Sequence, residues 1–232
     1  MLIYNDIPKS PVRKDQLSLI GACYFICQML AIFNTVSALL IFNVERGVFL
    51  KEYSQNLYHT LPYYLSKAII EAPLQIISAL TLSIMVYFVL GLEPEPANFF
   101  MFFFAILNLV LFSSSFGYIL GQIFTTPFAA NVVSSQIMMP LNILAGFYTN
   151  LALVPVWFVW LQYFSPARYC LEAIVQIQYQ DFNDEGGQLP NPIKYLNYDL
   201  GYWRCIYLMA SISTAYRVIS YFLFKRHSDT HK

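Results

Sequence analysis

The feature that most constrains this chain is a run of 72 residues, 96–167, that contains no Asp, Glu, Lys, Arg or His. A soluble domain could not solvate such a stretch, because an exposed surface of that size needs charged side chains to stay dispersed. About 20 apolar residues cross a bilayer as a helix, so this run holds two crossings and has room for a third, shorter dip. The sequence therefore predicts an integral, multi-pass membrane protein.

The composition agrees with a membrane location and argues against several other classes of protein. Hydrophobic residues make up 58% of the chain and charged residues only 11%, against about 25% in typical soluble domains. The formal net charge is zero, which predicts neither a nucleic-acid partner nor a polybasic lipid-binding arm. The four cysteines have no metal-ligand spacing, and Cys23 and Cys27, one helical turn apart in an apolar segment, suit helix packing.

The predicted fold is all-α, a polytopic membrane helical bundle of about five transmembrane helices. Apolar runs are separated by Pro- and Gly-containing turns such as GLEPEP (91–96) and GQIFTTP (121–127). The crossings are expected at residues 18–43, 66–90, 97–121, 129–150 and 204–224. A further helical pattern over 156–180 is rich in Trp and Tyr, which favour the membrane–water boundary, and predicts an interfacial or re-entrant helix.

The segment Glu45–Leu65 predicts an amphipathic connecting helix that lies along the bilayer surface. Its apolar residues recur every four positions, as Phe49, Tyr53, Leu57 and Leu61. Such a helix serves either as a membrane-anchored connector or as a docking surface for a soluble partner. Lys and Arg concentrated near this segment and the C-terminus favour the cytoplasmic side for both, whereas three basic residues near the N-terminus favour the opposite orientation: Lys9, Arg13 and Lys14.

Three blocks of sequence occur in a characteristic order. The first is ER-x-x-F-x-(K/R)-E-Y at Glu45–Tyr53, and the second is Y-x-x-(A/S)-K-x-x-x-E-x-P within residues 63–75. The third and most specific spans 145–179, with a Gly-aromatic pair followed by P-x-W, W-x-x-Y and R-Y-x-x-E-A. Together these blocks resemble the membrane domain of the G subfamily of ATP-binding-cassette (ABC) transporters, the White or pigment-precursor type of half-transporter, over residues 17–226.

The resemblance implies the membrane-spanning part of an ATP-driven transporter of lipids, sterols, pigments or other hydrophobic compounds, in the plasma membrane or an intracellular membrane. Partners would be another half-transporter, as a homo- or heterodimer, and an ABC ATPase domain. The sequence has neither a G-x-x-x-x-G-K-(S/T) phosphate loop nor an ABC signature. We therefore expect no enzyme activity and no cofactor in this chain itself, with ATP and Mg²⁺ acting in a nucleotide-binding domain outside it.

On the plan of the family, the chain resembles a C-terminal piece of a half-transporter. Residues 1–16 would be the end of a missing first helix plus an outer loop, and 17–226 the transmembrane domain. Within that domain, 151–203 would be an outer loop with the re-entrant helix, and 227–232 would follow as a cytoplasmic tail.

The resemblance also implies roles for individual residues. Substrate contacts would come from two crossings, at Phe33, Asn34, Ser37, Ser135, Met139 and Asn142. An apolar plug at the outward exit would be formed by Phe147 and Tyr148. Coupling to the ATPase domain would run through Glu45, Arg46, Phe49 and Glu52. Flat aromatic and flexible Met side chains suit apolar ligands, although a residue such as Phe33 is ordinarily a packing or lipid-facing residue.

Charged residues inside the predicted spans have structural explanations. Lys67 and Glu71 lie one turn apart and are expected to form a pair. Arg217 either snorkels to the cytoplasmic boundary or pairs inside the bundle. Glu172 is expected to hold the outer helix, with Arg168 four residues before it.

Two other functions are weighed against transport. An intramembrane enzyme would need a His with a carboxylate, a Ser with a base or paired Asp inside the bilayer, and all three histidines lie outside the predicted spans. A non-catalytic membrane scaffold or an inactive fragment is the stronger alternative, because the chain alone has no machinery for using ATP.

Overall fold

A computed structural model describes residues 13–55, 59–92, 95–124, 126–147, 160–179 and 200–230, together with residues 193, 196 and 198. The elements within these ranges are all helical, which confirms the predicted all-α fold. They are α1 (Arg13–Ser54), α2 (Thr60–Val89), α3 (Pro96–Ile123), α4 (Pro127–Ile143), the 3₁₀ helix η2 (Trp160–Phe164), α6 (Pro166–Tyr179) and α8 (Tyr202–Thr230).

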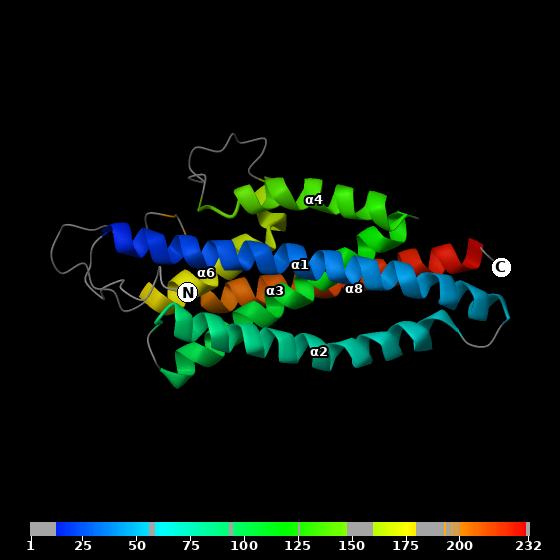
Figure 1. Ribbon diagram of the computed structural model, residues 1–232, viewed down its shortest axis with the longest axis horizontal. Coiled ribbons are helices and arrows are strands. Elements are labelled where there is room, and N and C mark those ends of the chain that lie inside the picture. The colour runs from blue at the N-terminus through cyan, green and yellow to red at the C-terminus, as the bar shows by residue number, and fades with distance from the viewer. Residues whose placement is uncertain are drawn as a thin grey trace.

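The long helices lie side by side along one axis, with α3 at the centre of the bundle (Figure 1). α3 packs against α1, α2, α6 and α8, whereas α2 and α4 flank α1 on opposite sides. The end of α1, the start of α2 and the C-terminus lie together at one end of the bundle, which we call the α1–α2 end. The end of α2 and the start of α8 lie at the other, the α2–α3 end.

Proline and glycine set several helix boundaries. α3 and α4 begin with Pro96 and Pro127, at the position where a helix has no use for the missing N–H group. Gly91 follows α2 with a φ of 62°, a left-handed conformation that a residue without a side chain adopts at no steric cost. The predicted turns at 91–96 and 121–127 are therefore confirmed at their described residues.

Within the described part of the chain, four helices are long and apolar enough to cross a membrane: Ser18–Tyr53, Thr60–Val89, Pro96–Ile123 and Tyr202–Arg226. α4 has 17 residues and rises about 26 Å, close to the roughly 30 Å of a hydrocarbon core. It runs back from the α1–α2 end, where α3 stops, toward the end where α8 starts (Figure 1). The four long helices, taken together with α4, agree with the predicted bundle of about five crossings.

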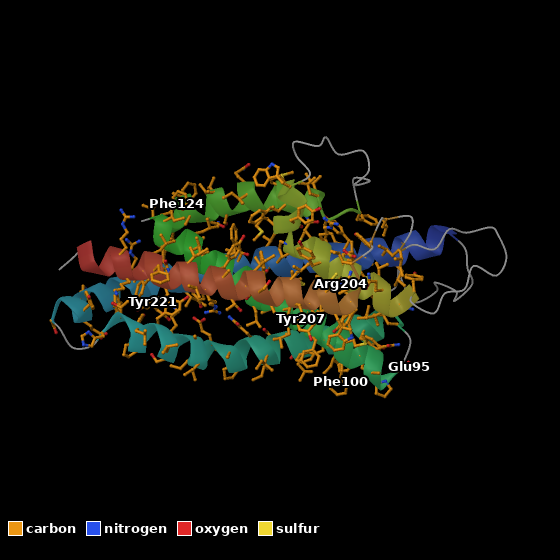
Figure 2. The ribbon with its side chains drawn as sticks, turned by 180° about the vertical axis from the view of Figure 1, so that it is seen from behind. Glu95, Phe100, Phe124, Arg204, Tyr207 and Tyr221 are labelled. Atoms are coloured by element: carbon orange, nitrogen blue, oxygen red, sulfur yellow. The ribbon has the colours of Figure 1, made fainter. Side chains whose placement is uncertain are left out.

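The outside of the bundle is apolar, as a protein solvated by lipid tails requires. Figure 2 shows Phe100 of α3 at the margin of the bundle, and Tyr207 of α8 is 69% exposed. α2 exposes a row of large apolar side chains that includes Ile69, Leu74 and Phe88. Soluble monomers rarely expose apolar surface of this extent.

The separate surface helix predicted over Glu45–Leu65 is replaced by two longer helices. Its residues through Ser54 extend α1, and its last residues open α2. Phe49 and Tyr53 turn into the bundle instead of onto the membrane surface, because they find aromatic partners there, whereas Leu61 is exposed and Leu57 lies outside the described residues. Phe49 is buried, with its ring centroid 4.5 Å from those of Tyr63 in α2 and Phe224 in α8.

The predicted interfacial or re-entrant helix is observed as η2 followed by α6. Twelve of the 14 residues of α6 are buried, and it packs against α1, α3 and α8. α6 is therefore an internal part of the bundle. Residues 156–159 of the predicted helix, like residues 1–12, lie outside the described residues.

α1 and α3 approach closely at Gly117. A Cβ atom there would lie 2.4 Å from the backbone oxygen of Thr35 and 3.0 Å from the Cβ of Ala38. The Thr35 hydroxyl also donates to the Ser113 backbone oxygen across the same contact, at 3.2 Å. Ser113, Gly117 and Gly121 recur every four residues, the small-residue spacing that lets membrane helices pack backbone to backbone.

Candidate functional site

A crevice between α1 and α2 brings together three of the residues assigned to substrate contact. Phe33, Asn34 and Ser37 line it from α1, and the α2 wall consists of Ser78, Leu82 and Val86. The cavity volume is about 410 Å³, within the range of roughly 300–1,000 Å³ found for ligand pockets. Phe33 is 68% exposed, so its ring is available to a ligand or to lipid.

The three assigned residues of α4 lie elsewhere. Ser135 and Met139 are on the exposed face of α4, where Met139 is 62% exposed, whereas Asn142 is fully buried. α4 and α2 lie on opposite sides of α1 (Figure 1). The structure therefore separates the six assigned residues into two groups, one in the crevice and one on α4.

Tyrosine hydroxyls hold the end of α4. Tyr24 Oη donates to the Asn142 backbone oxygen and Tyr198 Oη donates to the Ala145 backbone oxygen, both at 2.8 Å. Burial raises the pKa of the Tyr198 phenol above its usual range. The Asn142 side chain has no hydrogen-bond partner among the described residues.

Phe147, one of the two residues assigned to the exit plug, rests on α1 of its own chain. Its ring stacks on Tyr24 with centroids 5.3 Å apart and planes inclined by 18°. A Cβ atom at Gly21 would lie 2.9 Å from the same ring. Tyr148, the other assigned residue, lies outside the described residues.

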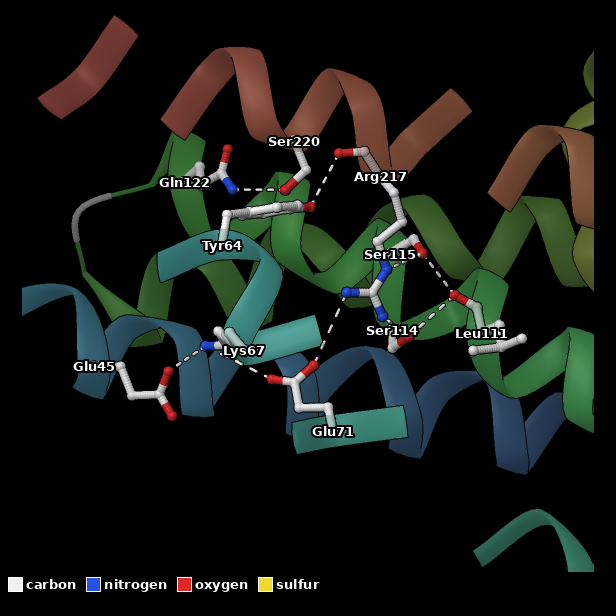
Figure 3. Close-up of polar contacts among 10 residues, drawn as sticks. All are labelled: Glu45, Tyr64, Lys67, Glu71, Leu111, Ser114, Ser115, Gln122, Arg217 and Ser220. Atoms are coloured by element: carbon white, nitrogen blue, oxygen red, sulfur yellow. Dashed lines mark hydrogen bonds and ion pairs between the residues drawn. The ribbon is translucent and has the colours of Figure 1, made fainter. Parts of the chain in front are cut away.

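Charged side chains form a network between helices toward the α1–α2 end (Figure 3). Lys67 of α2 bonds Glu45 of α1 and lies 3.7 Å from Glu71, so the predicted pair one turn apart is confirmed. Glu71 Oε2 is in turn 3.9 Å from Arg217 Nη1 of α8. Opposite charges held in apolar surroundings interact far more strongly than at a protein surface.

Arg217 pairs inside the bundle, which decides between the two roles expected for it. Its Nε donates to Ser115 Oγ at 3.0 Å and its Nη2 to Ser114 Oγ at 3.3 Å. The guanidinium carbon also lies 4.9 Å from the centre of the Tyr118 ring. One side chain of α8 therefore joins α2 and α3 in the interior.

The four residues assigned to coupling lie on the last turns of α1. Phe49 is part of the aromatic cluster with α2 and α8, and Glu45 is part of the charge network through Lys67. Arg46 is buried and Glu52 is half-buried. This end of α1 is tied to its neighbours by both packing and charge.

Glu172 of α6 is fully buried and anchors the start of α8. Its Oε1 accepts from the Leu200 backbone N–H at 2.8 Å and from Gln176 Nε2 at 3.5 Å. The Arg168 guanidinium lies 5.5 Å from the centre of the Tyr163 ring. Glu172 therefore holds α6, as expected, to the backbone that leads into α8.

Sequence reasoning missed the polar residues of α3 and the α2 wall of the crevice. Ser114 and Ser115 accept hydrogen bonds from Arg217, and Ser113 has the small-residue spacing with Gly117. Three consecutive serines in an apolar helix are a sequence signal for such interhelical contacts. Ser78 and Leu82 had no comparable signal, because they look like ordinary residues of an apolar helix.

Comparison with known proteins agrees with this architecture. The sequence profile of the ABC-2 type transporter family matches residues 1–179. ABC transporter G family member 31 of Arabidopsis thaliana is 26% identical over 173 residues, 75% of this chain and 12% of that protein. Protein white of Ceratitis capitata is 29% identical over 161 residues, 69% of this chain and 24% of that protein.

A third relative extends the similarity toward the end of the chain. ABC transporter G family member 53 of Oryza sativa subsp. japonica is 25% identical over 213 residues, 91% of this chain and 15% of that protein. The chain thus spans less than a quarter of the length of the relatives it matches. The chain belongs to the ABC-2 type transporter family and is a membrane domain of the G subfamily of ABC transporters.

Proposed function

We propose that this chain is the membrane-spanning part of an ATP-driven transporter that moves hydrophobic compounds, such as lipids, sterols or pigments, across a membrane. The observation that carries the proposal is the charge network that joins α1, α2, α3 and α8 beside the residues assigned to coupling. A force applied to the end of α1 would reach its neighbours through the Glu45–Lys67 ion pair and through the packing of Phe49 on α2 and α8.

ATP hydrolysis would occur in a partner ATPase domain that docks at the α1–α2 end. The coupling residues would receive its movement there: Glu45, Arg46, Phe49 and Glu52. On this proposal the chain is not an enzyme by itself, and ATP and Mg²⁺ would bind in the nucleotide-binding domain.

The active unit would be a dimer with another half-transporter, either a second copy or a paralogue. Lipid gives no hydrophobic drive for helix association, so close packing and polar contacts must hold the two membrane domains together. Pairing through the exposed faces of α1 and α4 would bring Phe33 of one domain and Met139 of the other toward a common cavity. Phe147 and Tyr148 would then close its outer exit.

The test is ATP-dependent movement of a fluorescent phosphatidylcholine in proteoliposomes that contain the chain and its ATPase partner. We expect Glu45→Gln to lower transport at least roughly fivefold while ATP hydrolysis continues, since coupling free energies of this kind are about 1–3 kcal/mol. Val48→Ala, on the exposed side of the same turn, is the matched control and should transport normally. ATP hydrolysis without transport of this lipid, of a labelled sterol or of an apolar dye would favour the scaffold alternative.

A further inference from the structure

We infer that Cys27 of α1 and Cys170 of α6 form a modification site, a dithiol that an organic hydroperoxide dissolved in the bilayer oxidises to a disulfide. The bond would join two helices that pack against each other but lie far apart in the sequence, since 143 residues separate the two cysteines. Formation of the disulfide is independent of the proposed function, whereas its effect on transport rests on the proposed function.

The two thiols are in contact in the interior of the bundle. Their Sγ atoms lie 3.5 Å apart, and both side chains are fully buried. Cys170 Sγ donates to the Ala105 backbone oxygen of α3 at 3.8 Å, so the hydrogen between the two sulfur atoms comes from Cys27. The sulfur atoms need to approach by about 1.5 Å to reach the bond length of a disulfide.

The surroundings favour a bond between the two sulfur atoms over metal binding. Within the described part of the chain, no group of three or more His, Cys, Asp or Glu residues could hold a metal ion. Cys23 and Cys205 are also buried, free thiols. They therefore serve as reference thiols, because any difference in their oxidation reflects the contact between Cys27 and Cys170 and not burial alone.

The oxidant would reach the pair through lipid. A buried, protonated thiol reacts slowly, and water-soluble oxidants have no direct access to it. The α1–α2 crevice is lined by Ile26 and Leu30, on either side of Cys27 in the sequence, and by Ile106 of α3, which follows Ala105. The crevice therefore leads from the bilayer to the side chains that cover the pair. Hydroperoxides of acyl chains accumulate in a bilayer, so a slow reaction has time to proceed.

Oxidation proceeds in two steps that balance. First, one sulfur attacks the hydroperoxide, so that an S–O bond forms, the O–O bond breaks and the thiol proton passes to the departing oxygen, which leaves as an alcohol. Second, the neighbouring sulfur attacks the sulfenic acid, so that the S–S bond forms and the S–O bond breaks. Water leaves with the second thiol proton. The two thiols lose two electrons, which the hydroperoxide gains. A thiol already in contact favours this second step over further oxidation.

The disulfide would fix α1 to the interior of the bundle. α6 packs against α3 and α8, and Glu172 holds it to the backbone that leads into α8. On the proposed function, α1 receives the movement of the ATPase domain near Glu45, and Cys27 lies in the opposite half of the same helix. A covalent bond to α6 would prevent α1 from moving relative to α6. Oxidation would therefore switch transport off.

Mass spectrometry of the full chain in phosphatidylcholine nanodiscs tests the modification. The sample is incubated for hours with cumene hydroperoxide, denatured, alkylated with N-ethylmaleimide and digested without reduction. We expect two peptides joined through Cys27 and Cys170, with Cys23 and Cys205 alkylated. Cys27→Ala and Cys170→Ala should each abolish the joined peptides. The matched controls Cys23→Ala and Cys205→Ala should form them as the wild type does.

The transport assay in proteoliposomes tests the consequence. After treatment with cumene hydroperoxide, ATP-dependent lipid movement by the wild-type assembly should fall in proportion to the fraction of chains that carry the disulfide. The Cys27→Ala assembly should keep the rate that it has without treatment. This variant also controls for damage to the lipid, because it lies in a bilayer treated in the same way.

Recovery of all four cysteines as alkylated thiols, or a disulfide that includes Cys23 or Cys205 instead, would overturn the inference. A disulfide between Cys27 and Cys170 with unchanged transport would refute the effect of the cross-link and leave the proposed function intact. Failure of the proposed function has a different signature, which is the absence of ATP-dependent lipid movement in the untreated wild type, whether or not the disulfide forms.

Discussion

At the residue scale, Arg217 is the charged side chain that depends most on its partners. It is a cation in a helix long and apolar enough to span the membrane, and it contacts Glu71, Ser114 and Ser115 on two other helices. A buried charge is tolerated only while its partners remain, because removal of one partner leaves the other charge without compensation. The effect of substitutions therefore depends on whether one charge or both are removed.

We predict that Glu71→Leu lowers the free energy of unfolding by about 3 kcal/mol, because Arg217 loses its carboxylate while Lys67 keeps Glu45. Adding Arg217→Leu should recover most of the loss. Denaturant unfolding of the full chain in detergent measures both variants. Thr214→Ala, exposed one turn earlier on α8, serves as control and should stay within about 0.5 kcal/mol of wild type. A double variant less stable than Glu71→Leu would show that the two charges act separately.

Phe147 gives a second prediction at this scale. Gly21→Ala places a methyl group 2.9 Å from the ring and should displace it from α1. If the ring closes the exit, basal ATP hydrolysis by the assembled transporter should rise, as it should in the double variant Phe147→Ala with Tyr148→Ala. Phe147→Leu keeps apolar bulk and is the control. Normal surface expression must be shown first, and an expressed double variant with wild-type basal and stimulated hydrolysis would mean that these aromatics only pack.

At the element scale, the contact between α1 and α3 should respond strongly to a single methyl group. Gly117→Ala puts a Cβ atom 2.4 Å from a backbone oxygen of α1, so the helices must separate, at a cost of about 1–3 kcal/mol. Gly47→Ala, in α1, meets nothing within 4 Å and should stabilise by about 0.5–1 kcal/mol through helix propensity. Thermal unfolding of the two variants should shift in opposite directions. Equal shifts would mean that α1 and α3 do not rely on this contact.

The elements themselves follow closely from sequence, whereas their contacts do not. Apolar length and the prolines at 96 and 127 predict α2, α3 and α8 and the turns between them, because these are properties of single segments. Whether Glu45–Leu65 forms a separate surface helix depends on Tyr63 and Phe224, the aromatic partners of Phe49, which the amphipathic spacing does not reveal. Among site residues, the pairing of Lys67 with Glu71 is local and predictable. The position of Phe33 opposite α2 depends on how two helices pack.

At the scale of the whole molecule, cationic side chains gather at the α1–α2 end. Arg46 and Lys51 lie on the last turns of α1, and Lys225 and Arg226 lie near the end of α8, which reaches the same end of the bundle (Figure 1). Basic residues near the ends of spans favour the cytoplasmic side. This end also holds the residues assigned to coupling, so the sidedness of the molecule bears directly on its function.

Cysteine labelling can determine that sidedness. All four native cysteines are buried, so an impermeant maleimide should react mainly with an introduced thiol. Gln55→Cys at the α1–α2 end should be labelled only after permeabilisation, and Ala97→Cys at the α2–α3 end in intact cells, since both positions are exposed. The unsubstituted chain is the control for background reaction. Labelling of Gln55→Cys in intact cells would place the coupling residues on the side without ATP, and the proposed function would then lose its physical basis.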